Sequence, residues 1–238
     1  MVPDGKSSVL GIIPARGGSK RIPRKNVKPF CGKPILAYSI EAAKDSLLFD
    51  EIMVSTDDEE IAGIARQYGA SVPFLRSEAT ANDYAVIADV LMEVICCYQQ
   101  NGQKFDYVCC IYPTAPFVTA GKLRSAFQML QEGVGDGIIS ITAFSYPPLR
   151  GLAVKNDFVQ MKWPEYRRAR SQDLEPIYHD CGQFLFIRTS ALIREKKVFC
   201  EKMLGMVLPE LEVQDIDTEM DWELAELKYS LLKRWGRL

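Results

Sequence analysis

Histidine and long apolar runs are what this 238-residue sequence lacks most clearly. Its one histidine, His179, excludes a zinc site built from several imidazoles. No apolar run approaches the ~18 residues of a membrane-spanning helix, and the opening residues, MVPDGKSS, contain no signal-peptide core. We therefore expect a cytoplasmic chain that does not cross or bind a membrane.

Disulfide and metal-binding cysteine patterns are also absent. The seven cysteines are an odd number and include no CxxC spacing. Two pairs, Cys96–Cys97 and Cys109–Cys110, are sequence neighbours, and on a strand such neighbours point to opposite faces. We interpret the cysteines as reduced packing residues, which agrees with a cytoplasmic protein.

The sequence has no large excess of positive or negative charge. The 29 basic and 31 acidic residues leave a formal charge of −2, so the chain has no general affinity for nucleic acid or for an anionic membrane. Apolar residues make up 47% and charged residues 25%, which excludes a disordered, collagen-like or coiled-coil protein. The length fits one large α/β domain, and we predict a single domain over residues 1–238.

Short apolar runs of strand length alternate with segments of helix length through the first 142 residues. Strands that alternate with helices imply crossover connections and a mostly parallel sheet covered by helices on both faces. We expect strands at 9–14, 51–56, 72–76, 107–112 and 137–142, and helices at 34–46, 58–69, 84–101 and 119–132.

This alternation stops between Ala143 and about Asp180, where the chain is rich in Pro, Arg, Trp and Tyr and shows no helical period. A structureless loop of that length is unusual in a compact domain, so we expect residues 143–180 to form an inserted, hairpin-like arm. Regular structure is expected again as a strand at 183–187, a short helix after 189, a strand leading into 213–216, and a final helix from about 218 with Met220, Leu224, Leu227 and Leu231 on one face.

The strongest local signal is a basic loop with two glycines directly after the first predicted strand. Gly17 and Gly18 let the backbone approach a ligand closely and point successive N–H groups toward it. Arg16 and Lys20 can meet phosphate oxygens, the first as a planar fork and the second as a point charge. Ligands of open α/β sheets collect at the carboxyl ends of strands, where this loop begins. Between Arg16 and Lys33 there is no acid and there are seven basic residues, Arg16, Lys20, Arg21, Arg24, Lys25, Lys28 and Lys33.

The residue pattern of this loop differs from the two commonest phosphate-binding motifs. It contains neither the Walker pattern GxxxxGK[ST] nor the dinucleotide pattern GxGxxG. A solvated basic loop or a nucleic-acid patch is the alternative, but a solvated loop has little reason to exclude every acid while starting at a strand end. We therefore predict that the loop binds phosphate.

Asp215 and Asp217 are two residues apart in a segment expected to be extended, so both carboxylates should project from one face. Mg²⁺ favours one or two carboxylates completed by substrate phosphates and water, which suits this pair. Helix capping is the alternative, because Thr218 and Asp221 have the T-x-x-D spacing of a cap. Capping would be favoured if this motif stood alone; together with the basic loop, a metal site is favoured.

Two further groups of polar residues are weaker candidates. Asp57 and Asp58, in the segment STDD, could bind metal, but capping of the helix that follows is the favoured interpretation. His179 stands next to an acid, yet a lone histidine more often has a structural or substrate hydrogen-bonding role.

The run IIPARGGSKRIPRKNVKPF closely resembles the first motif of the acylneuraminate cytidylyltransferases, the family of CMP-sialic acid and CMP-Kdo synthetases. The resemblance continues in VSTDDEEIA, YPTAPF and QDIDTEMDWELAE, so it spans nearly the whole chain in the right order. The phrases IYPTAPF and YHDCGQF look most like the branch of the family that activates pseudaminic acid, a bacterial nonulosonic acid.

This resemblance implies a Rossmann-like, mostly parallel three-layer α/β fold of the nucleotide-diphospho-sugar transferase type, with residues 143–180 as a dimerisation arm. It implies that CTP and an acidic nine-carbon sugar give a CMP-sugar and pyrophosphate, with Mg²⁺ as cofactor and a homodimer whose arms are exchanged. We expect the product to be CMP-pseudaminic acid, used for bacterial surface glycans. The same reaction on sialic, legionaminic or Kdo-type acids is the alternative within this class.

The family pattern also carries roles onto single residues. A planar guanidinium suits the carboxylate of the acceptor, and Arg170 is chosen because RSQDLEPIY resembles the family segment; surface ion pairs with Glu165 or Glu175 are an equally weighted alternative. The resemblance implies catalytic roles for Arg16, Lys20, Asp215 and Asp217, nucleotide contacts from Ala15, Arg16, Gly17, Gly18, Ser19, Lys20, Lys25, Asn26 and Arg76, acceptor contacts from Tyr112, Arg170, Gln172, Asp180 and Gln183, and metal binding by Asp215 and Asp217.

The sequence departs from the family pattern at one point. After Asp83 the family usually has one or two small hydroxyl residues, whereas Tyr84, Ala85 and Val86 follow here. A side-chain hydroxyl contact to phosphate at that position is therefore not expected. No side chain stands out as a general base, a role that the metal or a carboxylate acting through water can fill.

A non-catalytic nucleotide-sensing module with the same basic loop is the alternative from another functional class. Asp215 and Asp217 argue against it, because a sensor needs no metal for phosphoryl chemistry.

Overall fold

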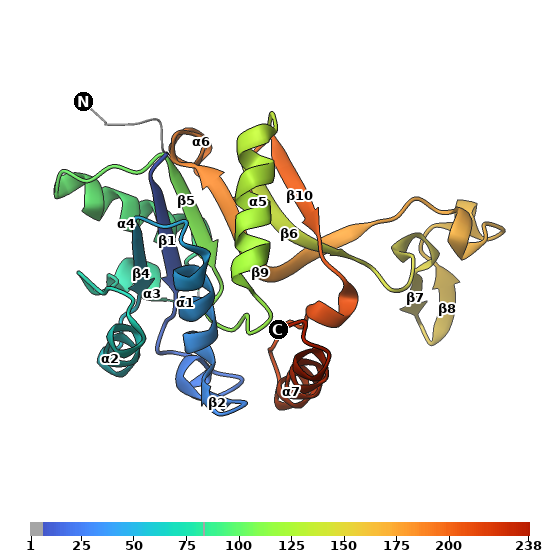
Figure 1. Cartoon of the computed structure of the whole chain (residues 1–238). Helices are drawn as coiled ribbons and strands as arrows, with labels where there is room; N and C mark the ends of the chain where they lie inside the picture. Colours follow the sequence, from blue (N-terminus) through green and yellow to red (C-terminus); the bar gives the residue numbers. More distant parts are fainter. Residues whose placement is uncertain (1–6, 83) are drawn as a thin grey trace.

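The computed structural model describes residues 7–82 and 84–238. Most of the opening segment MVPDGKSS, for which we expect no signal-peptide core, lies outside these described residues. A six-stranded sheet with the order β10-β6-β9-β5-β1-β4 forms the centre (Figure 1). β1 pairs in parallel with β4 and β5, and β10 with β6, whereas β9 is antiparallel to both neighbours, which confirms the predicted mostly parallel sheet. The strands are β1 (Val9–Pro14), β4 (Glu51–Ser55), β5 (Tyr107–Ile111), β6 (Gly137–Ala143), β9 (Tyr178–Arg188) and β10 (Met203–Val207).

Helices cover both faces of the sheet, as predicted. One core lies between the sheet and α1, α2 and α5, and the other between the sheet and α4 and α6. β9 serves both cores, because Phe184 and Phe186 enter the first while Leu185 and Ile187 enter the second. None of the helices in the described ranges is long and apolar enough to span a bilayer. The helices are α1 (Ile35–Ser46), α2 (Glu59–Tyr68), α3 (Glu78–Ala81), α4 (Ile87–Gln100), α5 (Ala120–Glu132), α6 (Thr189–Glu195) and α7 (Glu219–Arg234).

Two helix caps lie at the edge of the sheet where the parallel strands end, and the one at Asp58 confirms the interpretation favoured for the STDD segment. The Asp58 carboxylate accepts a hydrogen bond of 3.0 Å from the Ile61 amide at the start of α2. The Thr119 hydroxyl accepts one of 3.3 Å from the Lys122 amide at the start of α5. Both caps fix helices whose preceding loops face the same edge, so that edge is well ordered for binding.

Two predicted strands differ from the structure. Residues 72–76 form no strand; an isolated bridge joins Met53 to Ser71, the residue just before them. Pro73 has no amide hydrogen to donate to a ladder. The last strand is β10, earlier than predicted, because Met203–Val207 takes up the pairing with β6. Residues 213–216 instead follow a short 3-10 turn, Glu210–Glu212, and lead directly into α7.

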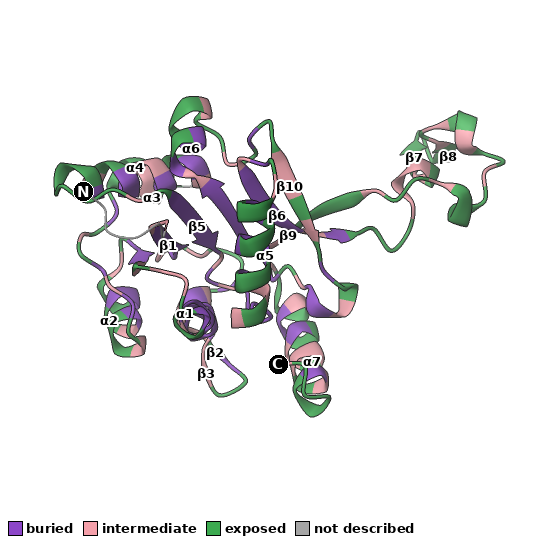
Figure 2. Ribbon diagram, turned by 45° about the horizontal axis from the view of Figure 1, so that its top comes forward, coloured by how far each residue is buried: buried purple, intermediate pink, exposed green. Residues whose placement is uncertain are grey.

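The inserted segment contains a hairpin of two strands, β7 (Leu152–Lys155) and β8 (Phe158–Met161), which pair only with each other. Asn156 and Asp157 between them have φ of 49° and 65°, as a tight hairpin turn requires. The hairpin projects from the body (Figure 1) and is exposed on its surface (Figure 2). Its side chains Leu152 and Val154 are 64% and 74% exposed, so the arm has no hydrophobic core of its own.

The last helix packs with a different face from the one its leucines define. Trp222, Ala225 and Leu232 of α7 are buried against Phe30, whereas Met220, Leu224 and Leu227 are exposed. The helix is apolar on both sides, and the aromatic group around Phe30 selects the Trp222 side. Phe30 belongs to a small hairpin that closes the basic loop, formed by β2 (Pro29–Phe30) and β3 (Lys33–Pro34).

Candidate active site

The basic loop leaves the end of β1 at the sheet edge and is held from behind by acids of the next strand. The Ala15 amide donates to the Ser55 carbonyl at 2.9 Å, which continues the β1–β4 pairing by one residue. The Gly17 amide donates to the Asp57 carboxylate at 2.9 Å. A Cβ atom on Gly17 would lie 2.8 Å from the nearer Asp58 carboxylate oxygen, so only glycine fits there.

Asp58 joins three parts of this edge. Besides capping α2, its two carboxylate oxygens accept hydrogen bonds from the Arg24 guanidinium at 2.5 and 3.1 Å. These bonds from Arg24 hold the pKa of Asp58 below its ordinary value. Arg24 also pairs with Glu60, and its backbone has a left-handed φ of 56°. The segment STDD therefore fixes the far end of the basic loop as well as the helix.

The loop forms one wall of an open cavity of about 380 Å³ at the carboxyl edge of the sheet. Its opposite wall is the YPTAPF segment, which follows β5. Asn26 is buried, and its side-chain amide donates to the Arg16 carbonyl at 2.9 Å, which fixes the loop conformation from inside. Such a cationic, polar recess suits a polyanion. The lining residues are Pro14, Arg16, Ser19, Lys20, Arg21, Lys25, Asn26, Tyr112, Pro113 and Thr114.

A second, smaller cavity of about 160 Å³ adjoins the first and shares Pro14 and Arg16 with it. Arg76, buried at its wall, donates to the Ser55 carbonyl at 2.6 Å and to the Ser55 hydroxyl at 3.0 Å. Burial lowers the pKa of Arg76 against the opposing effect of Asp57. The Arg16 guanidinium donates to the Asn82 carbonyl at 3.1 Å, which places it between the two cavities.

The acid pair lies in the loop between the 3-10 turn and α7, not on a strand, which corrects the expected strand geometry. Asp217 pairs with Arg21 at 2.7 Å and lies 3.6 Å from the Lys25 ammonium. Lys25 also donates to the Ile216 carbonyl at 2.6 Å, so the basic loop holds this segment directly. Burial and, to a smaller extent, the like charge of Asp217 raise the pKa of Asp215.

The capping alternative is satisfied by neighbouring residues. The Thr218 hydroxyl and the Asp221 carboxylate form a reciprocal capping box at the start of α7. Asp221 also accepts from the Asp217 amide at 3.1 Å. The carboxylates of Asp215 and Asp217 are therefore not needed as caps.

The donor set around the acid pair suits Mg²⁺ better than a metal enclosed by protein. In the described part of the chain, no three His, Cys, Asp or Glu side chains gather in a group that could hold a metal. Two carboxylates beside a cationic cavity match an ion that keeps water and substrate phosphates as its other ligands.

The residues expected to bind the acceptor are divided between the cleft and the arm. Tyr112 lines the large cavity, and burial, followed by acids that include Asp180 and Asp215, raises its pKa. Asp180 is exposed and accepts from the Gly182 amide at 2.8 Å. Gln183 is buried; its side-chain nitrogen donates to the Glu212 carbonyl at 2.6 Å, while its side-chain oxygen has no partner among the described residues.

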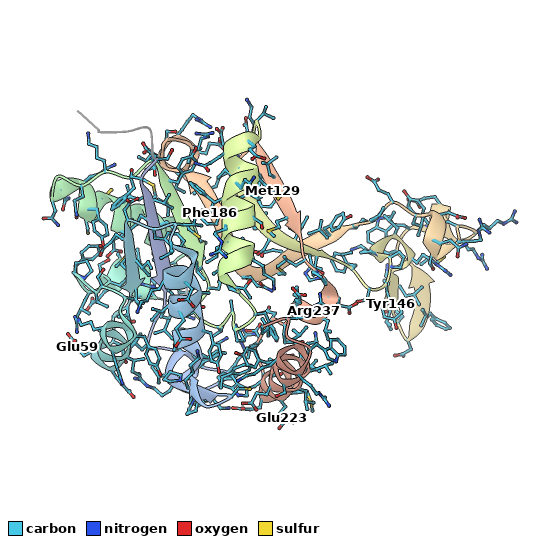
Figure 3. The ribbon with its side chains drawn as sticks, viewed as in Figure 1. Glu59, Met129, Tyr146, Phe186, Glu223 and Arg237 are labelled. Atoms are coloured by element: carbon cyan, nitrogen blue, oxygen red, sulfur yellow. The ribbon has the colours of Figure 1, made fainter. Side chains whose placement is uncertain are left out.

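Arg170 and Gln172 lie away from the cleft of their own chain. Arg170 forms a two-bond ion pair with Asp173 within the arm, rather than with Glu165 or Glu175. Gln172 lines a recess at the base of the arm. Tyr146, labelled in Figure 3, is in this same projecting region and is 86% exposed.

Several cavity residues were not identified from the sequence. Pro113 and Thr114 line the large cavity, and Thr80, Asn82 and Ala85 line the small one. Thr80 lies in the four-residue helix α3 and the others in loops, segments too short to show a periodic signal. Only the position of Pro113 and Thr114 directly after β5 could have indicated them. Tyr84, at the departure from the family pattern, is 93% exposed, and residue 83 before it lies outside the described residues.

Comparison with known proteins finds cytidylyltransferases that match nearly the whole chain. The profile of a family described as cytidylyltransferase matches residues 10–208. The pseudaminic acid cytidylyltransferase of Campylobacter jejuni strain 81-176 is 42% identical over 223 residues, covering 93% of this chain and 96% of the relative. The CMP-N,N'-diacetyllegionaminic acid synthase of Legionella pneumophila is 36% identical over 227 residues, covering 92% of this chain and 94% of the relative.

Solved structures share the fold at low sequence identity. The structure of CMP:2-keto-3-deoxy-manno-octonic acid synthetase complexed with CTP has a TM-score of 0.68 at 17% identity, covering 94% of this chain and 99% of that chain. A 4-diphosphocytidyl-2C-methyl-D-erythritol synthase from Anaerococcus prevotii has a TM-score of 0.65 at 13% identity, covering 95% of this chain and all of that chain. These two likenesses concern the architecture of the sheet and its helices.

Proposed function

The chain belongs to the cytidylyltransferase family, and on that premise we propose that it joins the cytidine monophosphate part of CTP to pseudaminic acid and releases pyrophosphate. It is a CTP-using nucleotidyltransferase by its family and its sequence relatives. The observation that carries the proposal is the junction of two cavities at Arg16, the larger one cationic and the smaller one bounded by Arg76. The first suits a triphosphate, and the second suits a planar base.

In the proposed reaction, the anomeric hydroxyl oxygen of the acceptor forms a bond to the α-phosphorus of CTP. The bond from this phosphorus to the oxygen bridging toward the β-phosphate breaks, pyrophosphate leaves with the electron pair, and the hydroxyl proton passes to solvent. The charges of Arg16, Lys20 and Lys25 bind the phosphates and offset the negative charge that grows on the leaving group. No side chain of the cleft is assigned as the base.

Magnesium is proposed as the cofactor, with Asp215 and Asp217 as its protein ligands. The pair lies beside the cationic cavity, and the Arg21 and Lys25 contacts to Asp217 partly neutralise it while no ion is bound. The ion supplies charge stabilisation at the α-phosphate and at the leaving pyrophosphate. Lys25 of the basic loop orients the segment that carries Asp215 and Asp217, because its ammonium donates to the Ile216 carbonyl between them.

The choice of acceptor is supported by sequence similarity and by the polarity of the cleft. The relative at 42% identity is named a pseudaminic acid cytidylyltransferase, and the one at 36% acts in the synthesis of a CMP-legionaminic acid. Tyr112 lines the large cavity, and both Asp180 and Asp215 contribute to the raised pKa of its hydroxyl, so these groups lie near the place where the reacting end of the acceptor has to be. Legionaminic acid is the second candidate, because both acids have nine carbons.

A homodimer with exchanged arms is part of the proposal. The hairpin exposes Leu152 and Val154, and an apolar face of this kind on an isolated hairpin marks an interaction site. Arg170 and Gln172 are on the same arm and away from their own cleft. An exchanged arm would bring them to the acceptor in the cleft of the partner. A cytoplasmic location is supported by the seven cysteines, which are all free thiols.

Pyrophosphate release with CTP across a panel of nonulosonic acids tests this function. We expect the highest kcat/KM with pseudaminic acid and a strict need for a divalent cation. Higher kcat/KM with legionaminic acid would favour the second candidate. CTP binding without pyrophosphate release on any acceptor would support the nucleotide-sensing module instead.

A further inference from the structure

A further cavity, of about 200 Å³, has Asp215 of the acid pair in its wall and no residue of the basic loop. It is bounded by the end of β6, the start of β9, the 3-10 turn and α7, and Asp215 belongs to its wall. It shares no lining residue with the two nucleotide cavities. Asp215 therefore stands at a boundary, with phosphate-binding groups on one side and a separate recess on the other.

The geometry of the reaction decides what can reach this recess. The acceptor hydroxyl has to meet the α-phosphorus close to Asp215 and Asp217, and the nucleotide fills the space on the side of the basic loop. The remainder of the acceptor must then extend away from the nucleotide, past Asp215. The recess is smaller than the ~300 Å³ at which whole-ligand pockets begin, so it fits a substituent rather than a complete sugar.

The recess combines a cation and an anion that approach it from different elements. Lys228 of α7 is half-buried, and its ammonium donates to the Val213 carbonyl at 2.8 Å, which uses one of its three hydrogens. Glu210 of the 3-10 turn accepts a 2.5 Å hydrogen bond from the Ser145 hydroxyl, which leaves other lone pairs of the carboxylate for a ligand. Burial lowers the pKa of Lys228, whereas Glu210 raises it, so the two charges influence each other.

The remaining groups make the recess mixed in polarity. The His179 ring lies 4.7 Å from the Phe144 ring, centre to centre, and its Nδ1 atom contacts the Asp180 carbonyl at 2.9 Å. Val213 and Thr142 are buried at the floor. A secondary amide matches such a lining, because it has one donor, one acceptor and a small apolar group.

We propose that Lys228 and Glu210 form a subsite that recognises an acylamino substituent of the acceptor, Lys228 donating to its carbonyl oxygen and Glu210 accepting from its N–H. This inference rests on the proposed function, since it needs a nonulosonic acid as the acceptor. It makes Lys228 and Glu210 specificity-determining residues that act on the acceptor and not on CTP. A hydroxyl at the same carbon lacks the acyl carbonyl oxygen to which Lys228 donates in this arrangement.

The test uses Lys228→Met and Glu210→Leu in the full chain, each assayed with two nine-carbon keto acids, one carrying acylamino groups and the other hydroxyls at the same carbons. The wild type should prefer the acylamino acid. Each variant should raise the KM for the acylamino acid about tenfold, because a buried polar group then loses its partner. The kcat, the KM for CTP and the KM for the hydroxyl acid should each stay within about twofold.

Matched controls separate recognition from a structural role. Lys233→Met and Glu223→Leu change exposed residues of the same helix outside the recess, and Glu223 is labelled in Figure 3. Both should keep the wild-type preference. If Lys228→Met lowers the melting temperature, the ratio of the two KM values still reports recognition, because a loss of stability affects both acids alike.

Three results would overturn the subsite. The variants could raise the KM of both acids equally, raise the KM for CTP, or keep the preference for the acylamino acid. In each case the wild type still releases pyrophosphate, so the proposed function survives. A wild type that uses no nine-carbon acid at all would remove both proposals.

Discussion

The amide of Gly17 donates to the carboxylate of Asp57 at 2.9 Å, so an acid of one loop holds the backbone of the basic loop that follows β1. The neighbouring Asp58 lies so close that a Cβ atom on Gly17 would be 2.8 Å from its carboxylate. The basic loop therefore takes its shape from the anionic segment behind it, before any phosphate binds. This preorganisation reduces the cost of ordering the loop around CTP.

Gly17→Ala should disturb this contact. The new methyl group has to displace Asp58, which breaks the α2 cap and the Arg24 pair, so we expect a loss of about 1–2 kcal/mol in the free energy of unfolding. The KM for CTP should rise along with it. Gly18→Ala is the control for stability, since no atom lies within 4 Å of a Cβ built there. Urea denaturation of both variants measures the free energy of unfolding. Equal midpoints for the two variants would contradict the tight fit at Gly17.

Lys20→Ala should separate activity from stability. Lys20 is exposed and lines the large cavity, so its removal leaves the hydrophobic cores unchanged. Loss of a charge placed at the phosphates should lower kcat by about 10²–10³. Lys104→Ala, an exposed lysine outside the cavities, should keep full turnover. A folded Lys20→Ala enzyme with wild-type kinetics would disprove the phosphate assignment.

Asp217→Asn tests the metal site against the cap. Asparagine keeps the shape but removes one charge from the site, so turnover should fall by orders of magnitude. Stability without ligand should change little, because the partly exposed Arg21 pair contributes at most about 1 kcal/mol.

Asp221→Ala is the matched variant, and it should behave in the opposite way. It breaks the capping box with Thr218 and should cost about 1 kcal/mol of stability while most of the turnover remains. Thermal melting and pyrophosphate release are measured for both variants. Near-normal turnover of Asp217→Asn with a lowered melting temperature would favour capping and refute the metal assignment.

Asp215 should make the protein without ligand less stable as the pH rises. Its pKa is raised in the folded state, so between the unfolded and folded pKa values the folded protein binds more protons, and the free energy of unfolding falls with increasing pH. Asp215→Asn should therefore melt at a higher temperature than the wild type at neutral pH, and the difference should vanish at a pH below the unfolded pKa. Melting curves at several pH values measure this. A variant less stable than the wild type at neutral pH would show that Asp215 has a favourable partner.

The double variant Leu152→Asp/Val154→Asp tests the exchanged arm. These side chains share one face of the hairpin, and two charges there should prevent apolar docking, so we expect a monomer with a raised KM for the acceptor. Gln160→Asp, on the other face, is the control. Sedimentation gives the oligomeric state. A wild type that is monomeric at working concentration would remove the arm proposal and leave the reaction untouched.

Much of the body of the fold could be predicted from the sequence, because its signals are local. β1 and β5 are continuous apolar runs, and α2 and α5 begin at Asp58 and Thr119, which cap by short-range bonds. The failures concern tertiary choices. Nothing local shows that Met203–Val207 takes the place beside β6, or that α7 buries Trp222 rather than Leu224 and Leu227.

The candidate site could be predicted only where it is continuous in sequence. The basic loop brings Arg16, Lys20 and Lys25 to one cavity by itself. The wall around Arg76 and Asn82, and the recess at Lys228, are assembled from segments far apart in the chain. Their positions depend on how the strands are ordered, which residue spacing does not reveal.

The strand β9 begins at the arm and runs through the middle of the sheet between β5 and β6. Its outer residues, Tyr178–Asp180, pair only with β6 among the described strands, and farther along the Gln183 carbonyl accepts from the amide of the cavity residue Tyr112 at 2.9 Å. Arm and cleft floor are thus one continuous piece of backbone. If acceptor binding and arm docking favour the same conformation of this strand, acceptor binding must strengthen dimerisation, and dimerisation must strengthen acceptor binding by the same free energy. Turnover per chain would then depend on the concentration of the enzyme itself, rising as protomers associate and falling on dilution.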